Sequence, residues 1–132
     1  MKSHETFVKV RYAETDQMGV VYHGNYPQYL EIARINWLDS LGISYKSMEE
    51  EGIMLPVFEI NLKYHRPITF DENLRIETRL REAPNVKIIF DYTIYNENGE
   101  KVTSATSTLV FMDSKTRRPI RCPKYVLDAL KD

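Results

Sequence analysis

The fold of this chain is constrained most by one segment in which apolar residues recur at helical spacing. Segments in which apolar residues alternate as in strands precede and follow it. Between Asn25 and Gly42 the apolar side chains recur at the spacing of one helix face. These residues are Tyr26, Tyr29, Leu30, Ala33, Trp37 and Leu41. Asn25 is a capping-type residue, Pro27 is tolerated in a first helical turn, and Gly42 is a C-terminal stop signal. We therefore expect one long helix over residues 26–41.

Most of the remaining sequence alternates with a period of two, which is typical of half-buried strands. We expect strands at residues 6–12, 58–64, 74–81, 86–94 and 101–112. The turn at 96–99 joins the last two, and the last four strands are predicted to form an antiparallel meander. Short helices are expected at 44–51, where Ser47 and Glu50 form a possible capping box, and at 125–130.

This order of elements predicts an α+β domain in which one helix packs on one face of an antiparallel sheet. Small residues from Ser104 to Thr108 favour a close approach of the helix to the last strand. One helix does not cover a wide sheet, and Phe7, Leu109 and Phe111 remain on the alternate faces. Since edge strands also stay open, we expect self-association into a homo-oligomer.

Length and charge narrow the classes of function. The chain has 132 residues, which fits a single domain over residues 1–132. Its formal net charge of -1 argues against nucleic-acid binding driven by phosphate contacts. No apolar run approaches the ~18 residues of a membrane span. The first six residues are polar rather than signal-like, so we expect a cytoplasmic protein.

Cysteine and histidine usage speaks against bound metals. Cys122 is the single cysteine, and His4, His23 and His65 show no metal-ligand spacing. We therefore expect neither a disulfide framework nor a metal or redox cofactor.

The loop before the long helix is the best candidate for a chemical site. The first N–H groups of a helix lack partners within it and stabilise negative charge on an oxygen. The backbone N–H groups of His23 and Gly24 fall at this position, and Asp16 lies seven residues before His23. Asp16 would then act as a base or a nucleophile. From the residues alone, an acid that only caps backbone N–H groups is the favoured reading.

The segment from Glu14 to Arg34, ETDQMGVVYHGNYPQYLEIAR, resembles the signature of hotdog-fold acyl-CoA thioesterases of the 4-hydroxybenzoyl-CoA thioesterase and YbgC-like branch. The segment YHRPI at 64–68 fits the same pattern, and the similarity extends over almost the whole chain. The resemblance implies a hotdog fold, in which a curved antiparallel sheet wraps a long central helix. It also implies dimers that pair edge to edge, often assembled as dimers of dimers, which gives a homotetramer.

Carried over to this sequence, the resemblance implies that Asp16 is the catalytic carboxylate, as general base for water or as nucleophile. The backbone N–H of His23, with that of Gly24, would hold the charge of the tetrahedral intermediate. The His23 side chain is assigned equally to function and to pocket shape. Substrate contacts are expected from six residues: Tyr22, Asn25, Tyr26, Lys63, His65 and Arg66.

Several residue roles stay open at this point. A second basic cluster at Arg117, Arg118 and Arg121 is an alternative to Lys63, His65 and Arg66 for binding coenzyme A phosphates. Glu31 is expected to be solvated or ion-paired, and a catalytic role of Cys122 is disfavoured because no histidine neighbours it. An acyl group would contact the following apolar residues: Tyr26, Tyr29, Leu55, Val57 and Phe58.

The expected function is hydrolysis of an acyl-CoA thioester to a free acid and coenzyme A. One alternative is a thioesterase acting on acyl groups held by acyl carrier protein. Another is a non-catalytic acyl-CoA binding protein in which Asp16 only orders the loop. A hotdog dehydratase or hydratase fits the loop-acid signature poorly.

Overall fold

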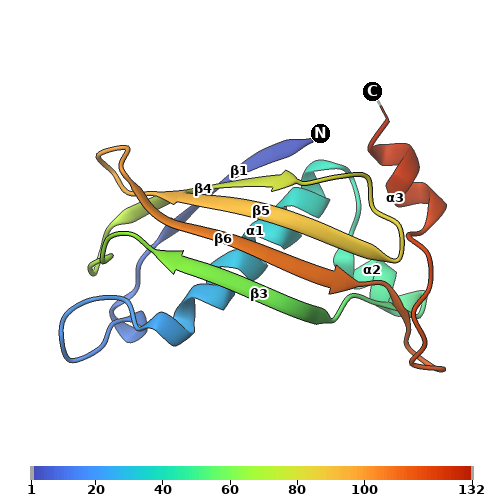
Figure 1. Ribbon diagram of the computed structural model, residues 1–132, viewed down its shortest axis with the longest axis horizontal. Helices are drawn as coiled ribbons and strands as arrows, with labels where there is room; N and C mark the ends of the chain where they lie inside the picture. The colour runs from blue at the N-terminus through green and yellow to red at the C-terminus, as the bar shows by residue number, and fades with distance from the viewer. Residues whose placement is uncertain (1, 132) are drawn as a thin grey trace.

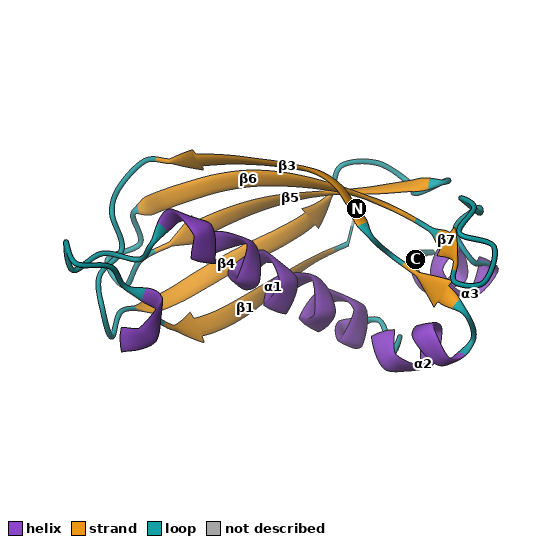
Figure 2. Cartoon of the chain, turned by 90° about the horizontal axis from the view of Figure 1, so that it is seen from below, coloured by secondary structure: helices purple, strands orange, loops and turns teal. Residues whose placement is uncertain are grey.

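An antiparallel sheet of five strands curves around one long helix (Figures 1 and 2). The computed structural model describes residues 2–131. Its sheet contains β1 (Ser3–Lys9), β3 (Val57–Tyr64), β4 (Asn73–Leu80), β5 (Lys87–Tyr95) and β6 (Lys101–Val110). The helix α1 (Tyr26–Ser40) lies across one face of this sheet. The predicted α+β architecture is therefore confirmed.

The long helix forms where its apolar spacing places it. Six of its side chains are buried: Tyr26, Tyr29, Leu30, Ala33, Trp37 and Leu38. The Trp37 ring meets the Phe90 ring of β5 edge to face, with centroids 5.1 Å apart. Burying each large side chain stabilises the fold by roughly 1.5–3 kcal/mol. The helix ends before Gly42, whose φ of +78° favours glycine.

The predicted meander is right for three strands and wrong for the fourth. Strands β4, β5 and β6 follow one another as antiparallel neighbours, but β3 pairs with β6 at the far edge of the sheet. The order across the sheet is β1-β4-β5-β6-β3. Residues 65–72 are too many for a tight hairpin, so the chain crosses the end of the sheet between β3 and β4 (Figure 1).

The first strand was placed several residues too late. It covers Ser3–Lys9, and a 3₁₀ turn η1 (Tyr12–Glu14) follows, with the Tyr12 side chain 76% exposed. The expected outward positions of Leu109 and Phe111 are also wrong, because both side chains are buried. Leu109 shares its face of β6 with buried Ser107 and Ala105, and strand alternation keeps these three on the helix side.

The short elements are partly as predicted. Helix α2 (Tyr45–Glu50) is capped by Ser44, whose Oγ accepts a hydrogen bond of 3.1 Å from the Ser47 N–H. Ser47 is thus not the capping residue. The expected terminal helix is α3 (Lys124–Ala129), whereas the small ladder of β2 (Ile53–Met54) and β7 (Met112–Asp113) was missed because each strand is only two residues long.

The sheet face away from α1 carries a polar network. The Arg81 guanidinium donates hydrogen bonds of 2.7 and 3.2 Å to the Asp91 carboxylate, and the Thr106 hydroxyl donates one of 2.9 Å to the same group. These contacts hold the pKa of Asp91 below its usual value although burial opposes the shift.

Among residues 2–131 no helix is long and apolar enough to cross a membrane.

Candidate active site

Glu14 anchors the loop that precedes α1. Its Oε1 accepts hydrogen bonds of 2.9 Å from the Arg11 N–H and 2.8 Å from the Tyr29 hydroxyl, and its Oε2 accepts one of 3.1 Å from Arg11 Nε. The Glu14 carbonyl oxygen accepts bonds of 2.9 Å from the Tyr22 N–H and from Asn25 Nδ2. One buried residue thereby fastens both ends of the loop and the start of the helix.

The electrostatics of this anchor follow from its partners. Burial raises the pKa of the Glu14 carboxyl, but the hydrogen bonds from Arg11 and Tyr29 outweigh burial, so the pKa lies below its usual value. Burial and the neighbouring Glu14 carboxylate raise the pKa of the Tyr29 phenol. Glu14 is therefore charged and Tyr29 neutral at pH 7.

Asp16 sits at a tight turn within the loop. The Met18 N–H donates a hydrogen bond of 2.8 Å to Asp16 Oδ1. The Asp16 N–H donates to the Val20 carbonyl at 2.8 Å, and Gly19 turns the chain with a φ of +80°. The other carboxylate oxygen, Oδ2, makes no hydrogen bond within the described part of the chain. The acid thus combines a capping contact with one oxygen left for chemistry.

The loop is joined to the segment that follows β3. The Val21 N–H donates a hydrogen bond of 2.8 Å to the Ile68 carbonyl, and Val20 forms a bridge with Thr69. The two segments enclose a cavity of about 420 Å³, here named the Asp16 cavity. Its lining consists of Asp16, Met18, Val20, Val21, His23, Tyr26, Tyr64, His65, Arg66 and Pro67. Five of the predicted site residues, namely Asp16, His23, Tyr26, His65 and Arg66, are therefore brought together.

The start of the helix faces this cavity through a 3₁₀ turn, η2 (His23–Asn25). The first N–H groups of such a turn, those of His23 and Gly24, have no partner within it. A Cβ at Gly24 would lie 2.6 Å from Cε2 of the Tyr22 ring, so the Tyr22 ring in its observed place requires glycine there. The turn is held from outside by Tyr64, whose hydroxyl donates a bond of 3.3 Å to the His23 carbonyl.

Four predicted site residues do not line the Asp16 cavity, namely Tyr22, Gly24, Asn25 and Lys63. The Tyr22 ring packs on the His23 ring, with centroids 4.3 Å apart. Asn25 faces back to Glu14. Lys63 lines a separate cavity of about 310 Å³ on the polar sheet face, because strand alternation directs it away from Tyr64.

The remaining basic residues of the site, His65 and Arg66, are already in contact with neighbours. His65 Nε2 lies 2.9 Å from the Ser104 Oγ, and Arg66 Nη1 lies 3.2 Å from the Glu100 carboxylate. These contacts are exposed, so solvent screens them and a phosphate ligand is able to replace them.

Other candidate chemistry is not supported at this site. Burial raises the pKa of the Cys122 thiol to about 11, so the thiol stays protonated near neutral pH. Within residues 2–131 no three metal-ligating side chains are grouped around a common point. The alternative cluster of Arg117, Arg118 and Arg121 contributes no residue to the Asp16 cavity.

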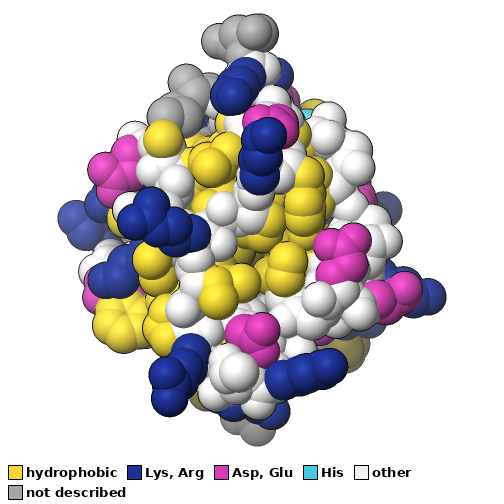
Figure 3. All heavy atoms as spheres, turned by 90° about the vertical axis from the view of Figure 1, so that its right-hand side faces the viewer, with side chains coloured by type: hydrophobic (Ala, Val, Ile, Leu, Met, Phe, Trp, Pro, Cys, Tyr) yellow, Lys and Arg dark blue, Asp and Glu magenta, His cyan; other side chains and the backbone are white. Residues whose placement is uncertain are grey.

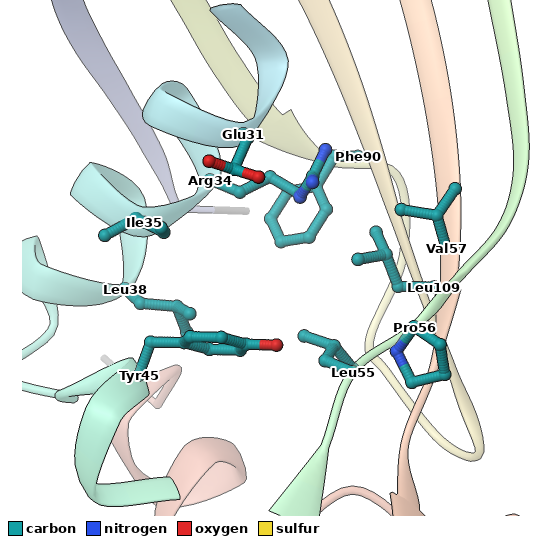
Figure 4. Close-up of a pocket in the computed structure, with 10 residues that line it drawn as sticks. All are labelled: Glu31, Arg34, Ile35, Leu38, Tyr45, Leu55, Pro56, Val57, Phe90 and Leu109. Atoms are coloured by element: carbon teal, nitrogen blue, oxygen red, sulfur yellow. The ribbon is translucent and has the colours of Figure 1, made fainter. Parts of the chain in front are cut away.

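A second cavity of about 420 Å³ lies between α1 and the start of β3 (Figure 4). We name it the Arg34 cavity. It is lined by Glu31, Arg34, Ile35, Leu38, Tyr45, Leu55, Pro56, Val57, Phe90 and Leu109. Figure 3 views this end of the molecule and shows hydrophobic side chains gathered between charged ones.

The predicted acyl contacts are divided between several places. Leu55 and Val57 line the Arg34 cavity, and Tyr26 lines the Asp16 cavity. Tyr29 is fully buried, and Phe58 is 65% exposed with the Lys87 ammonium 4.9 Å from its ring centroid. Glu31 was predicted to be solvated or ion-paired; it is exposed and forms no ion pair with another described residue.

Two residues that hold the candidate site in place received no site role from the sequence. Glu14 lies in the signature segment, and Tyr64 lies at the start of the YHRPI segment. The available signal for Glu14 was an acid placed directly before the Thr15-Asp16 pair, and for Tyr64 it was the first position of the YHRPI segment. Their contacts depend on tertiary packing, which the local pattern does not describe.

Comparison with known proteins identifies the family to which this chain belongs. The model of the thioesterase-like superfamily matches residues 10–130. YneP of Bacillus subtilis, a putative acyl-CoA thioesterase, is 38% identical over 121 residues, which cover 92% of this chain and 88% of YneP. A chloroplastic acyl-acyl carrier protein thioesterase of Arabidopsis thaliana is 33% identical over 124 residues, which cover 93% of this chain and 65% of that protein.

A solved structure agrees with these sequence relatives. The crystal structure of a DHNA-CoA thioesterase from Staphylococcus aureus superimposes with a TM-score of 0.92 at 38% identity. The superposition covers 97% of this chain and 86% of the other. The chain therefore belongs to the thioesterase-like superfamily, and its five-stranded sheet wrapped around α1 is a hotdog fold.

Proposed function

We propose that this chain hydrolyses acyl-CoA thioesters to a free acid and coenzyme A in the Asp16 cavity. Membership of the thioesterase-like superfamily and 38% identity to YneP support this reaction. The structural observation that carries the assignment of the site is the meeting of Asp16 and the start of the helical segment in one cavity. A carboxylate and an oxyanion site are the two groups that metal-free thioester hydrolysis requires.

The thioester carbonyl oxygen points at the N–H groups of His23 and Gly24, which hold its negative charge in the tetrahedral intermediate. In one route, Asp16 Oδ2 removes a proton from water as the water oxygen bonds to the carbonyl carbon. The C–S bond then breaks and the departing sulfur takes up the proton. In the other route, Oδ2 itself bonds to the carbonyl carbon, coenzyme A leaves, and water hydrolyses the acyl anhydride.

The surrounding side chains bind the substrate. Tyr26 and the His23 ring form the wall beside the thioester, while Tyr22 and Asn25 hold the oxyanion turn in place. His65 and Arg66 at the cavity rim bind the phosphates of coenzyme A, whereas Lys63 on the opposite sheet face takes no part in this contact.

Turnover of a panel of acyl-CoA esters tests this proposal. Free thiol release is measured for wild type and Asp16→Asn, which keeps an acceptor oxygen for the Met18 N–H. A positioned acid or base contributes about 10² to 10⁴ in rate, so we expect a folded variant with a loss of that size. Full activity of Asp16→Asn would refute the role of Asp16, and an inactive wild type would favour the non-catalytic acyl-CoA binding protein.

Acyl carrier protein is the second candidate carrier, because the Arabidopsis relative that acts on acyl-acyl carrier protein is 33% identical. The same acyl group presented on coenzyme A and on acyl carrier protein separates the two. A higher kcat/KM for the protein-bound ester would reassign the carrier without changing the role of Asp16.

The chain also assembles through the edge strand β3 into a two-fold dimer, and such dimers pair into a homotetramer. Residues of β3 are exposed or half-buried throughout, and Val57, Phe58 and Tyr64 are 45%, 65% and 48% exposed. Antiparallel pairing over the whole strand sets Val57 opposite Tyr64 of the partner subunit. A monomer mass in light scattering would refute this assembly.

Such a dimer joins two cavities that lie at opposite ends of β3. Val57 lines the Arg34 cavity and Tyr64 lines the Asp16 cavity. Pairing therefore brings the Arg34 cavity of one subunit beside the Asp16 cavity of the other.

We place the enzyme in the cytoplasm, because a single unpaired cysteine suits a reducing compartment.

A further inference from the structure

Arg34 brings a positive charge to an otherwise largely apolar cavity. Its side chain is half-buried, and Nη1 donates one hydrogen bond of 3.3 Å to the Tyr92 hydroxyl. Within the described chain Arg34 forms no ion pair with a carboxylate. A guanidinium carries five N–H donors in a fixed fork, so most of these donors lack a protein acceptor.

The support beneath Arg34 fixes where its donors lie. Tyr92 is buried on β5, and its hydroxyl lies 2.5 Å from the Ser107 Oγ of β6. The Tyr92 hydroxyl accepts the Arg34 hydrogen bond from the sheet side, and Figure 4 shows the guanidinium reaching from α1 over the Phe90 ring. The other walls are mostly carbon, with Leu55 and Leu109 among them. An occupant of the cavity would therefore meet mostly apolar walls, with Arg34 as the one cation beside the Glu31 carboxylate and the Tyr45 hydroxyl.

We infer that the Arg34 cavity receives the far end of the acyl group and selects acyl groups that carry a hydrogen-bond-accepting oxygen there. This inference rests on the proposed function and on the β3-paired dimer, which sets the cavity beside the Asp16 of the other subunit. A plain alkyl chain would strip water from the guanidinium and return no acceptor, which costs free energy. A distal oxygen restores the lost hydrogen bond.

Two sources supply such an oxygen, a carboxylate and a hydroxyl. Glu31 distinguishes them, because it also lines the cavity and is exposed. Its negative charge opposes a distal carboxylate, whereas a distal hydroxyl accepts from Arg34 and donates to Glu31. Glu31→Gln should therefore raise turnover of a carboxylate-bearing ester relative to a hydroxyl-bearing one.

The experiment compares kcat/KM within matched ester pairs. Adipoyl-CoA is compared with hexanoyl-CoA, and 4-hydroxybenzoyl-CoA with benzoyl-CoA. Wild type should favour the oxygen-bearing member of at least one pair, and Arg34→Met should lower that ratio about ten- to hundredfold. Arg34→Lys should restore part of it. Lys46→Met, which removes an exposed cation of α2, should leave the ratio unchanged.

The outcomes separate this inference from the proposed function. A wild type that hydrolyses all four esters without favouring either oxygen-bearing member overturns the role of Arg34 and leaves the thioesterase assignment intact. A wild type that hydrolyses no acyl-CoA ester overturns both. If Arg34→Met does not fold, Arg34→Lys and Glu31→Gln carry the test, and unchanged ratios in both variants overturn the inference.

Discussion

Tyr29, one helical turn inside α1, donates a hydrogen bond of 2.8 Å to the carboxylate of Glu14. Glu14 lies at the start of residues 15–22, the Asp16 loop, which joins η1 to η2. The same carboxylate accepts a hydrogen bond from the Arg11 N–H. The Glu14 carbonyl oxygen accepts hydrogen bonds from the Tyr22 N–H and from Asn25 Nδ2. The helix and the loop are thus locked together at a point that contacts no substrate in the proposed reaction. Glu14 and Tyr29 therefore hold in place the loop that carries Asp16.

Tyr29→Phe should lower the free energy of unfolding by about 1–2 kcal/mol, because a buried hydrogen bond to a charged group is lost. Urea denaturation measures this change. Tyr12→Phe is the matched control, since that side chain is 76% exposed, and it should shift stability by far less. Equal effects of the two substitutions would contradict the anchoring role.

Stability should fall in acid through Glu14. The folded-state pKa of Glu14 lies below its usual value, so its contribution is complete above the unfolded pKa of about 4.3. That contribution is lost as the pH falls through the folded pKa. We expect Glu14→Gln to be less stable than wild type at pH 7 and to lose less stability between pH 6 and pH 3, measured by denaturation at each pH. Parallel curves for the two proteins would argue against this linkage.

Gly24→Ala should reduce kcat about tenfold or more, because the new Cβ would force the Tyr22 ring off the His23 ring on which it packs. Tyr22→Ala removes the obstructing ring, so the double variant should recover part of the kcat lost in Gly24→Ala. Steady-state kinetics of both single variants and the double variant measure the coupling. Purely additive losses would show that the ring contact has no bearing on the turn.

Cys122 should react slowly with thiol reagents in the native protein. Its thiol is buried and its raised pKa of about 11 leaves little thiolate at pH 8. Labelling with a disulfide reagent should approach one thiol per chain only after unfolding in urea. Rapid labelling of the native protein would contradict this placement and would add background to assays of coenzyme A release.

The parts of the fold that local pattern dictates were predictable. Helix α1 follows from its apolar spacing, the Pro27 start and the Gly42 stop, and each strand of the sheet was detected. The edge position of β3 was not predictable, because a period of two assigns side chains to faces without naming the neighbouring strand. Tyr12 was misplaced for a related reason: alternation continues in sequence after the strand itself has ended.

The lining of the candidate site was predictable from the two segments that carry the family resemblance, but the contacts that hold it in place were not. The resemblance placed Asp16 and His23 together, and both line one cavity. Lys63 was grouped with His65 because they are close in sequence, yet the strand directs Lys63 to the other sheet face. The partnership of Glu14 with Tyr29 joins residues from different elements, which spacing within either element does not reveal.

The strand order β1-β4-β5-β6-β3 has a consequence for the order of folding. The hairpins of β4, β5 and β6 pair residues close in sequence, whereas β1 must reach across the chain to set Ser3 opposite Arg79. Short-range pairs form quickly and distant ones slowly. We therefore expect the central hairpins to assemble first and the loop that carries Asp16, which lies between β1 and α1, to acquire its shape last.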